Sequence, residues 1–253
     1  MKRNLLIILI VVFILSTICG CSEIKIYSVD TELSKLEEKG LFNSVNISAT
    51  DKNIIVTAEK VMSDSIRTII ILKLKNLKMN PGTGVSLRLT DDKSITYNLT
   101  SYTTKQSEII LEFTGGPKED STLTLEIRQF ESISGNWLLK IPVKVIDAKE
   151  YYVNKQYKID DTTLIIENIK FSTATTEIRY RESNNYRNIY DSKLLADKKE
   201  ITMFSAGASQ RDDSYIGYMY FDPIDIKNID AIKLRVKLNP ADEKFFDLDI
   251  PIN

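Results

Sequence analysis

Residues 121–130 read STLTLEIRQF, and residues 136–143 read NWLLKIPV. In the first stretch the apolar side chains of Leu123, Leu125 and Ile127 alternate with polar ones, which is the period of a strand with one buried face. Similar short runs follow one another from Val45 onward, separated by polar turn segments such as TDDK and TGGPKED. Strands at this spacing, with few helical stretches between them, predict β-sandwiches.

The pattern occurs twice in the chain. A shift of 109 residues places Trp137 on Phe246 and Leu139 on Leu248. Near the other end of the pattern, a shift of 110 places residues 54–56 on residues 164–166. The order and spacing of the apolar residues thus agree near both ends of the two halves of the chain. We therefore interpret the chain as two copies of one domain.

The sequence therefore predicts an all-β protein with two tandem immunoglobulin-like β-sandwiches, the first over residues 45–148 and the second over 149–253. Trp137 and Phe246 are expected at equivalent core positions. Each copy closes on an apolar strand that contains a proline, Pro142 or Pro251. Proline cannot donate to a strand ladder, so both closing strands are predicted at sheet edges.

Two shorter segments complete the organisation. Residues 30–40 (DTELSKLEEKG) predict a short helix with Asp30 as N-cap, Gly40 as C-cap and an apolar face of two leucines; a solvated stalk is the alternative. Residues 146–156 contain neither Gly nor Pro. We interpret them as an ordered linker in which the side chains of residues 151–153 cover the junction of the domains.

The N-terminal region has the pattern of a bacterial secretory signal. Lys2 and Arg3 precede the apolar run 5–15, which is short for a membrane-spanning helix. The next residues, Ile-Cys-Gly-Cys at 18–21, resemble the lipobox of bacterial lipoproteins. The resemblance implies a signal peptide over residues 1–20, lipidation of Cys21 with acyl chains such as palmitate, and a lipid-anchored linker with the short helix over 21–44.

Two alternative interpretations of this region are open. A redox pair or metal half-site formed by Cys19 and Cys21 would need partner ligands, and the chain has no further cysteine and no histidine. An uncleaved signal anchor is the second alternative. The lipobox interpretation places the protein on the extracytoplasmic face of the cell membrane, in the cell envelope. The abundance of Ile, Lys, Asn, Asp and Thr suits a low-GC, Gram-positive bacterium.

Composition excludes several classes of function. Without histidine, Ser-His-Asp and Cys-His catalysis and histidine metal ligation are absent. Without Lys2 and Arg3 the chain carries 32 basic and 35 acidic side chains, so its formal charge is −3 and nucleic acid is not an expected partner. An enzyme that uses paired carboxylates or a lysine is formally open, but we expect no catalytic activity.

Acidic pairs such as Asp91-Asp92 and Asp160-Asp161 raise the question of a metal. No such cluster has the Asp-x-Asp-x-Asp-Gly spacing of a calcium loop, and adjacent residues of a strand point to opposite faces. We interpret these acids as turn-forming residues and expect neither a metal nor a cofactor.

A surface rich in aromatic and basic residues is the predicted binding site. Residues 180–191 and 210–222 concentrate tyrosine and arginine, which are favoured in interfaces. The alternative is packing of alternate tyrosines in strands. The candidate binding residues are Tyr186, Arg187, Tyr190, Arg211 and Tyr215.

A resemblance to a known family supports this organisation. The stretch from Gly40 to Leu74 with the later SGNWLLKIPV resembles the extracytoplasmic domain of unknown function of Firmicute anti-sigma-factor-like membrane proteins. The half that opens KIDDTTLIIENIKF resembles the immunoglobulin-like domain that follows it there. A lipobox here replaces the cytoplasmic and transmembrane segments of those proteins, and a lipoprotein cannot contact a cytoplasmic sigma factor.

These observations together predict a lipid-anchored extracytoplasmic binding or sensing module without catalytic activity, linked to envelope signalling. The expected partners are the membrane, through the lipid anchor, and a protein or cell-wall polymer. The alternative is a structural spacer or scaffold lipoprotein that holds such a partner near the membrane.

Overall fold

A computed structural model describes residues 29–80, 82–159, 161–183, 189, 191–211, 214–238 and 244–252. The chain divides into two compact units, residues 1–35 and residues 36–253. The second unit contains every strand described below. Within the described residues, no helix is long and apolar enough to cross a membrane.

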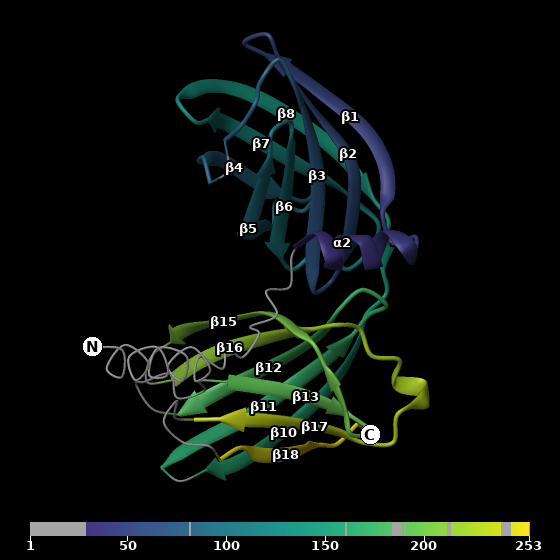
Figure 1. Cartoon of the computed structure of the whole chain (residues 1–253), viewed down its shortest axis with the longest axis vertical. Coiled ribbons are helices and arrows are strands. Elements are labelled where there is room, and N and C mark those ends of the chain that lie inside the picture. Colours follow the sequence, from purple (N-terminus) through teal and green to yellow (C-terminus); the bar gives the residue numbers. More distant parts are fainter. Residues whose placement is uncertain are drawn as a thin grey trace, which may run out of the picture. The chain divides into compact units, whose positions relative to one another are not determined.

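The first sandwich forms because its strands each bury one apolar face. Its strands are β1 (Asn43–Asp51), β2 (Ile54–Asp64), β3 (Arg67–Lys75), β4 (Val85–Thr90), β5 (Thr96–Lys105), β6 (Glu108–Thr114), β7 (Ser121–Phe130), β8 (Ile133–Val143) and β9 (Val145–Ile146). They pair in the order β1-β2-β3-β6-β5-β4-β7-β8 (Figure 1). In addition, β9 pairs parallel with β2. Only two residue pairs join β4 to β5, so the sheet folds over there and encloses one apolar core.

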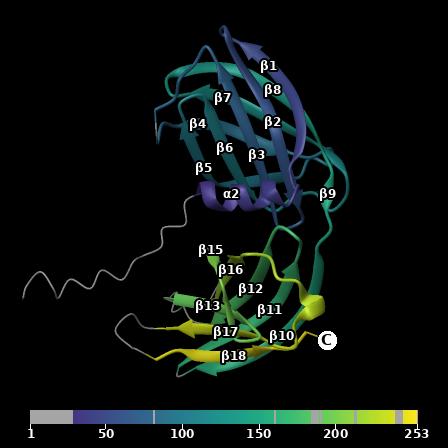
Figure 2. The ribbon, with the colours of Figure 1, turned by 45° about the vertical axis from the view of Figure 1, so that its right-hand side comes forward.

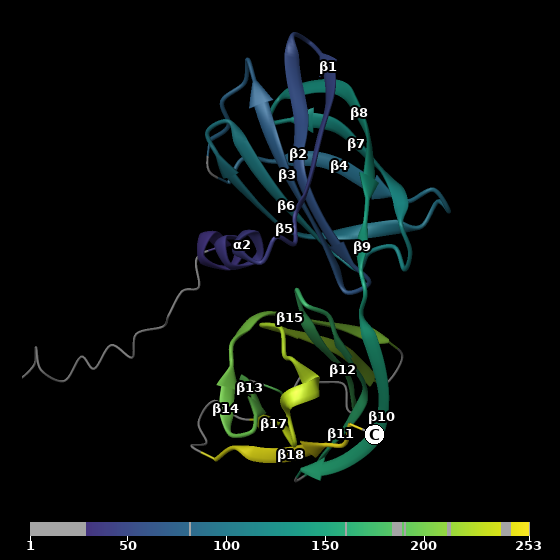
Figure 3. The ribbon, with the colours of Figure 1, turned by 90° about the vertical axis from the view of Figure 1, so that its right-hand side faces the viewer.

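The second sandwich repeats this arrangement with two separate sheets. Its strands are β10 (Lys149–Ile159), β11 (Thr162–Phe171), β12 (Thr176–Ser183), β13 (Asp191–Ala196), β14 (Lys199–Ile201), β15 (Met203–Arg211), β16 (Ser214–Phe221), β17 (Ile232–Lys237) and β18 (Phe246–Ile250). One sheet has the order β10-β11-β12-β16-β15 (Figure 2), and the other has the order β14-β13-β17-β18. Figure 3 looks into this sandwich and shows β13 and β14 on the side opposite β10 and β12. A short 3-10 helix, η1 (Ile226–Asn228), precedes β17.

The predicted helix is α2 (Val29–Glu38). Asp30 lies inside this helix, so the prediction that Asp30 is the N-cap is wrong. Its C-terminal end is as predicted: Gly40 has a positive φ of 67°, and its N–H donates to the carbonyl of Glu37 at 2.8 Å. The Leu41 N–H donates to the carbonyl of Leu36 at 3.1 Å, which completes a Schellman cap.

The two sandwiches have the same strand order, as two copies of one fold require. In both, a three-stranded meander (β1-β2-β3 or β10-β11-β12) is followed by a strand in the facing layer (β4 or β13) and later by a hairpin that returns to the first sheet. The second sandwich has the additional short strand β14 before that hairpin. The fold class predicted from the sequence, all-β with two tandem immunoglobulin-like sandwiches and a short helix, is confirmed.

The alignment of the first half of the repeat needs a correction. Ala58 pairs with Leu72 in the first sandwich, and Ile166 pairs with Tyr180 in the second, which is a shift of 108 residues and not 110. A displacement by two residues keeps every side chain on its original face, so hydrophobic alternation cannot detect it.

The second half of the repeat is aligned as predicted. Trp137 pairs with Ile127, and Phe246 pairs with Val236, so both shifts are 109. Trp137 is fully buried, whereas Phe246 is half-buried against the second core. β8 and β18, which close the two copies, are the last strands of their sheets, as their prolines predict.

The segment interpreted as a linker is mostly strand. β9 and β10 occupy residues 145–146 and 149–159, which leaves two residues between them. Tyr152 is 76% exposed, and the Tyr151 ring packs edge-on against Phe171 with centroids 5.8 Å apart. The prediction that residues 151–153 cover the domain junction is therefore wrong; Tyr151 belongs to the second core.

Candidate functional site

The residues predicted to form a binding surface are only partly described. Tyr186, Arg187 and Tyr190 lie outside the described residues, so their role stays a prediction. Arg211 ends β15, where its backbone is described, and Tyr215 is a half-buried residue of β16. In the pairing of β15 with β16, Arg211 lies opposite Ser214, the residue before Tyr215. Cys21, the predicted lipidation site, also lies outside the described residues.

The neighbouring tyrosines pack within the second sandwich, which is the alternative to a binding surface. Tyr180 and Tyr220 are buried, and Tyr180 belongs to the second core. A side chain at Gly217 would overlap the Tyr180 ring, so that position accommodates only glycine. Tyr218 is half-buried, with the Arg179 guanidinium carbon 5.7 Å from its ring centroid. These tyrosines therefore stabilise the second sandwich.

Two equivalent turns of the repeat contact each other. The turn between β2 and β3 carries Asp64, whose Oδ1 accepts hydrogen bonds from the backbone N–H groups of Ile66 at 2.8 Å and Arg67 at 2.7 Å. Its Oδ2 accepts a hydrogen bond of 2.6 Å from the Ser172 hydroxyl, which lies in the turn between β11 and β12. With a shift of 108, Ser172 is the repeat equivalent of Asp64, so a homologous pair of positions makes this contact.

Arg67 extends the contact between the same two turns. Its Nε donates to the Thr175 hydroxyl at 2.7 Å, and its Nη1 lies 3.2 Å from Oε1 of Glu112 on β6. Its guanidinium carbon is 4.4 Å from the centroid of the Phe204 ring. Arg67 is 2% exposed; the Glu112 carboxylate compensates its charge, and the Thr175 hydroxyl accepts one of its hydrogen bonds.

Burial changes the acid–base properties of the carboxylates near these turns. Desolvation raises the pKa of Asp64, although the hydrogen bonds from Ser172 and Arg67 and the positive charge of Arg67 act to lower it. Desolvation also raises the pKa of Glu177, and the neighbouring Lys170, 3.3 Å away, opposes that rise. Both carboxyl groups therefore hold protons to higher pH than exposed acids do.

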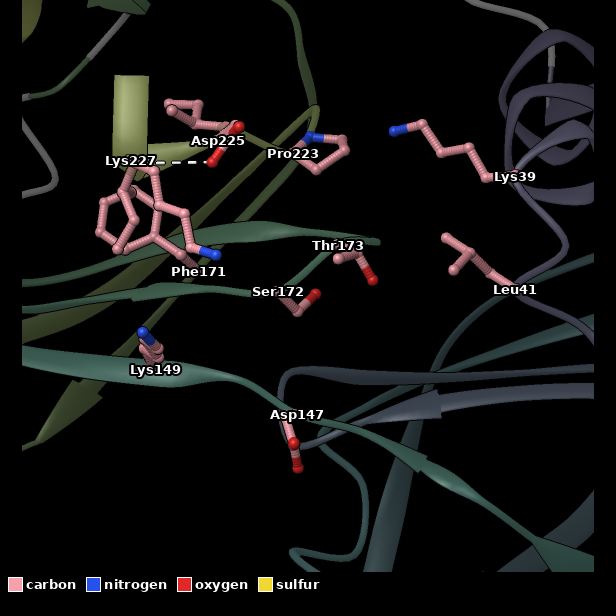
Figure 4. A pocket seen from close by; sticks show the side chains of 12 residues that line it. Lys39, Leu41, Asp147, Lys149, Phe171, Ser172, Thr173, Pro223, Asp225 and Lys227 are labelled. Atoms are coloured by element: carbon pink, nitrogen blue, oxygen red, sulfur yellow. Dashed lines mark hydrogen bonds between the residues drawn. The ribbon is translucent and has the colours of Figure 1, made fainter. Parts of the chain in front are cut away.

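A pocket of about 650 Å³ opens beside the turn that contains Ser172 (Figure 4). Half-buried or buried apolar side chains form part of its wall, and they belong to the segments around residues 41, 171 and 223–226. The lining residues are Lys39, Leu41, Asp147, Lys149, Phe171, Ser172, Thr173, Pro223, Ile224, Asp225, Ile226 and Lys227. This volume lies within the range of sites for small organic ligands.

The lysine and aspartate side chains around the pocket differ in their partners. Lys39, Lys149 and Lys227 are exposed and make no ion pair with a described residue. Figure 4 shows Lys149 and Phe171 on one side of the pocket and Lys39 and Leu41 on the other. Asp225 is engaged as the cap of η1, where it accepts hydrogen bonds from the Lys227 N–H at 3.2 Å and from Asn228 Nδ2 at 2.8 Å. Asp147 also lines the pocket and makes no ion pair with a described residue, so three ammonium groups face two carboxylates and the lining carries a net charge of +1.

Ser172 connects the pocket to the contact between the turns. Its side chain lines the pocket, and its hydroxyl donates to Asp64. The same oxygen accepts hydrogen bonds from the N–H groups of Ala174 at 3.0 Å and Thr175 at 2.8 Å, which fixes the turn. A ligand at this wall would thus lie against a residue that joins both sandwiches.

Asp91, one of the candidate acidic metal ligands, forms a turn. Asp91 Oδ1 accepts hydrogen bonds from the N–H groups of Lys93 at 3.0 Å and Ile95 at 2.8 Å, and Oδ2 accepts one from the Tyr97 hydroxyl at 2.8 Å. The interpretation of Asp91 as a turn-forming acid is confirmed. Among the described residues, no three acidic, histidine or cysteine side chains gather at the spacing of a metal site.

Sequence reasoning did not find the pocket. Its walls come from four separated segments: the end of α2, the start of β10, the β11–β12 turn and the residues around η1. No local motif marks such a combination. Phe171, Ser172 and Thr173 line the pocket, but in the sequence they resemble any other end of an apolar strand.

Comparison with known proteins places the fold. No family model and no curated protein matches the chain. Among solved structures, the conserved domain protein from Bacillus anthracis aligns with a TM-score of 0.64 at 14% identity, over 83% of this chain and 86% of that one. At this identity the likeness shows a shared fold only.

Two further structures align with low scores. Bovine butyrophilin covers 76% of this chain and 94% of its own, at 9% identity and a TM-score of 0.24. Domains 5–6 of the S-layer protein SbsC cover 82% and 94%, at 14% identity and a TM-score of 0.21. The chain thus has the fold of a Firmicute protein, the conserved domain protein from Bacillus anthracis.

Proposed function

We propose that the protein is a non-catalytic, extracytoplasmic ligand-binding module, anchored by lipid on Cys21, whose pocket binds an anion with an apolar portion. The observation that carries this proposal is the pocket of about 650 Å³, where apolar walls meet three lysines that make no ion pair with a described residue. An anionic head group would lie near these ammonium groups. Its apolar portion would cover side chains such as Phe171 and Ile224.

The sequence supports the location, and the family resemblance supports a role in envelope signalling. A positively charged start, an apolar run and the Cys21 lipobox favour export and lipidation. The resemblance to extracytoplasmic domains of Firmicute anti-sigma-factor-like proteins suggests that a ligand-bound state is passed to a membrane or cell-wall partner. A lipoprotein would need such a partner, because it does not reach the cytoplasm.

A spacer is the second candidate function, and one observation favours it. Asp64 and Arg67 of one sandwich hydrogen-bond to Ser172 and Thr175 of the other, and all four side chains are buried. Contacts of this kind suit a scaffold that holds a partner at a fixed distance from the membrane. A spacer needs no ligand in the pocket, so a binding measurement separates the two candidates.

Binding of the anionic dye 1-anilinonaphthalene-8-sulfonate tests the pocket. The protein is residues 21–253 with Cys21→Ser, which contains every described residue. In Lys149→Glu/Lys227→Glu, two attractive charges become repulsive, so we expect the dissociation constant to rise about tenfold, which is ~1.4 kcal/mol. The neutral dye N-phenyl-1-naphthylamine should bind the variant and the parent protein equally.

The matched control is Lys78→Glu/Lys140→Glu, which changes the net charge equally at two exposed lysines that do not line the pocket. It should bind the anionic dye like the parent protein. Equal weakening in both double variants would mean that overall charge, and not the pocket, attracts the dye. Absence of binding by both dyes would favour the spacer.

The lipid anchor is tested in the intact cell. Two or more acyl chains make membrane attachment stable, since each buried CH₂ contributes about 0.8 kcal/mol. Cys21→Ser should therefore release the protein from the membrane fraction or leave the precursor uncleaved, whereas Cys19→Ser should behave like the parent. Metabolic labelling with a palmitate analogue that still marked Cys21→Ser would rule out this site.

A further inference from the structure

β15 is the last strand of its five-stranded sheet and pairs on one side only, with β16. Residues 206–210 are exposed, and no hydrogen bond reaches Ser205–Gln210 from any described residue outside β16. One row of its backbone N–H and C=O groups therefore has no hydrogen-bond partner among the described residues. An edge of this kind can pair with another strand.

The other described edge strands of the second sandwich carry features that oppose such pairing. β10 has exposed lysines and a bulge between Tyr152 and Lys155. β14 has three residues, two of them charged, and β18 has Asp247 and Asp249 and is followed by Pro251. Charged side chains, bulges, proline and short length are the usual protection of edges. Residues 205–210 of β15 have none of them.

The sequence of this edge is symmetric about its centre. Residues 205–209 read Ser-Ala-Gly-Ala-Ser, with Gly207 in the middle. If two copies pair antiparallel around Gly207, each alanine faces an alanine and each serine faces a serine. A two-fold interface requires this self-complementarity, and the uncharged side chains cause no repulsion.

We propose that two copies of the chain associate edge to edge through β15, antiparallel, with the two-fold axis at Gly207. The five-stranded sheets of the two copies then form one continuous sheet. Small side chains at Ala206 and Ala208 let the strands approach without steric conflict. A single strand pair buries less surface than a standard stable interface, so the dimer is weak and forms at high local concentration.

Disulfide crosslinking tests both the contact and its register. Residues 21–253 with Cys21→Ser have no cysteine, because the chain contains only Cys19 and Cys21. A side chain at Gly207 would meet no atom within 4 Å, so Gly207→Cys fits the fold. Residues directly opposite in antiparallel strands lie about 4.5–5.5 Å apart at Cα, within disulfide reach.

We expect Gly207→Cys to form crosslinked dimers on mild oxidation. Ala206→Cys mixed with Ala208→Cys should form mixed dimers several-fold more than either variant alone, since diagonal neighbours lie about 7–8 Å apart. Leu138→Cys, at a position that is 50% exposed, is the control for random collision. Circular dichroism shows that each variant is folded. If folded Gly207→Cys crosslinks no more than Leu138→Cys, the proposal is overturned.

Discussion

Replacing Trp137 by alanine is expected to lower the free energy of unfolding of the first sandwich by about 3–5 kcal/mol. Trp137 is fully buried, its Nε1 donates to the carbonyl of Ile54 at 3.0 Å, and its ring packs against Phe130 with centroids 4.9 Å apart. The substitution leaves a cavity and removes the hydrogen bond to the Ile54 carbonyl. Urea denaturation followed by circular dichroism measures the loss, because the variant has no tryptophan to report fluorescence.

Two further variants check the reason for this loss. Trp137→Phe keeps most of the packed volume and should cost clearly less than Trp137→Ala. Phe246→Ala, at the equivalent position of the second sandwich, should also cost less because Phe246 is only half-buried. If Trp137→Ala cost under about 1 kcal/mol, the packing of the first core described above would be contradicted.

Asp64 is expected to show the second large effect. Asp64→Ala removes the acceptor of three donors, the N–H groups of Ile66 and Arg67 and the Ser172 hydroxyl. The Ser172 hydroxyl keeps the Thr175 carbonyl, 3.2 Å away, as an acceptor, but the two backbone N–H groups lose theirs. Buried donors without an acceptor cost about 1–3 kcal/mol each, so we expect a loss of about 3 kcal/mol. Asp64→Asn is the matched control, because its Oδ1 can keep both backbone hydrogen bonds. Urea denaturation at constant pH compares the two.

The pH dependence distinguishes the charge of Asp64 from its hydrogen bonds. Its pKa is raised by burial, so the folded chain binds this proton more tightly than the unfolded chain. The resulting stabilisation is complete below the ordinary pKa of about 3.9 and is lost as the pH rises through the raised value. Asp64→Asn should remove the contribution of Asp64 to the change of unfolding free energy with pH. The pKa of Glu177 is also raised, so the contribution of Glu177 should remain. An unchanged slope in Asp64→Asn would contradict the account.

Much of the fold could be predicted because alternation is a local property. In strands such as β7 and β11, apolar and polar residues alternate, which predicts a strand directly. Gly40 likewise predicts the end of α2. The repeat was found for the same reason. Its first half was misaligned by two residues because such a displacement preserves the pattern of buried faces.

The pocket could not be predicted, because it depends on which segments the topology brings together. Lys39 and Lys227 are separated by most of the chain, and each is an ordinary exposed lysine in its local context. Asp64 and Arg67 likewise belong to a short polar turn whose burial follows only from the contact with Ser172 and Thr175. Sequence reasoning favoured the tyrosine-rich strands instead, where Tyr180 and Tyr220 turned out to be buried.

The central claim is that the pocket beside Ser172 binds an anion with an apolar portion. Titration of dodecyl phosphate, below its micelle concentration, into protein with ¹³C-labelled methyl groups tests it most directly by NMR. We expect the methyl signals of Leu41, Ile224 and Ile226, which line the pocket, to shift with one saturable curve, while that of the exposed Ile95 stays in place. Shifts spread over exposed methyl groups, with the pocket signals unchanged, would contradict the claim.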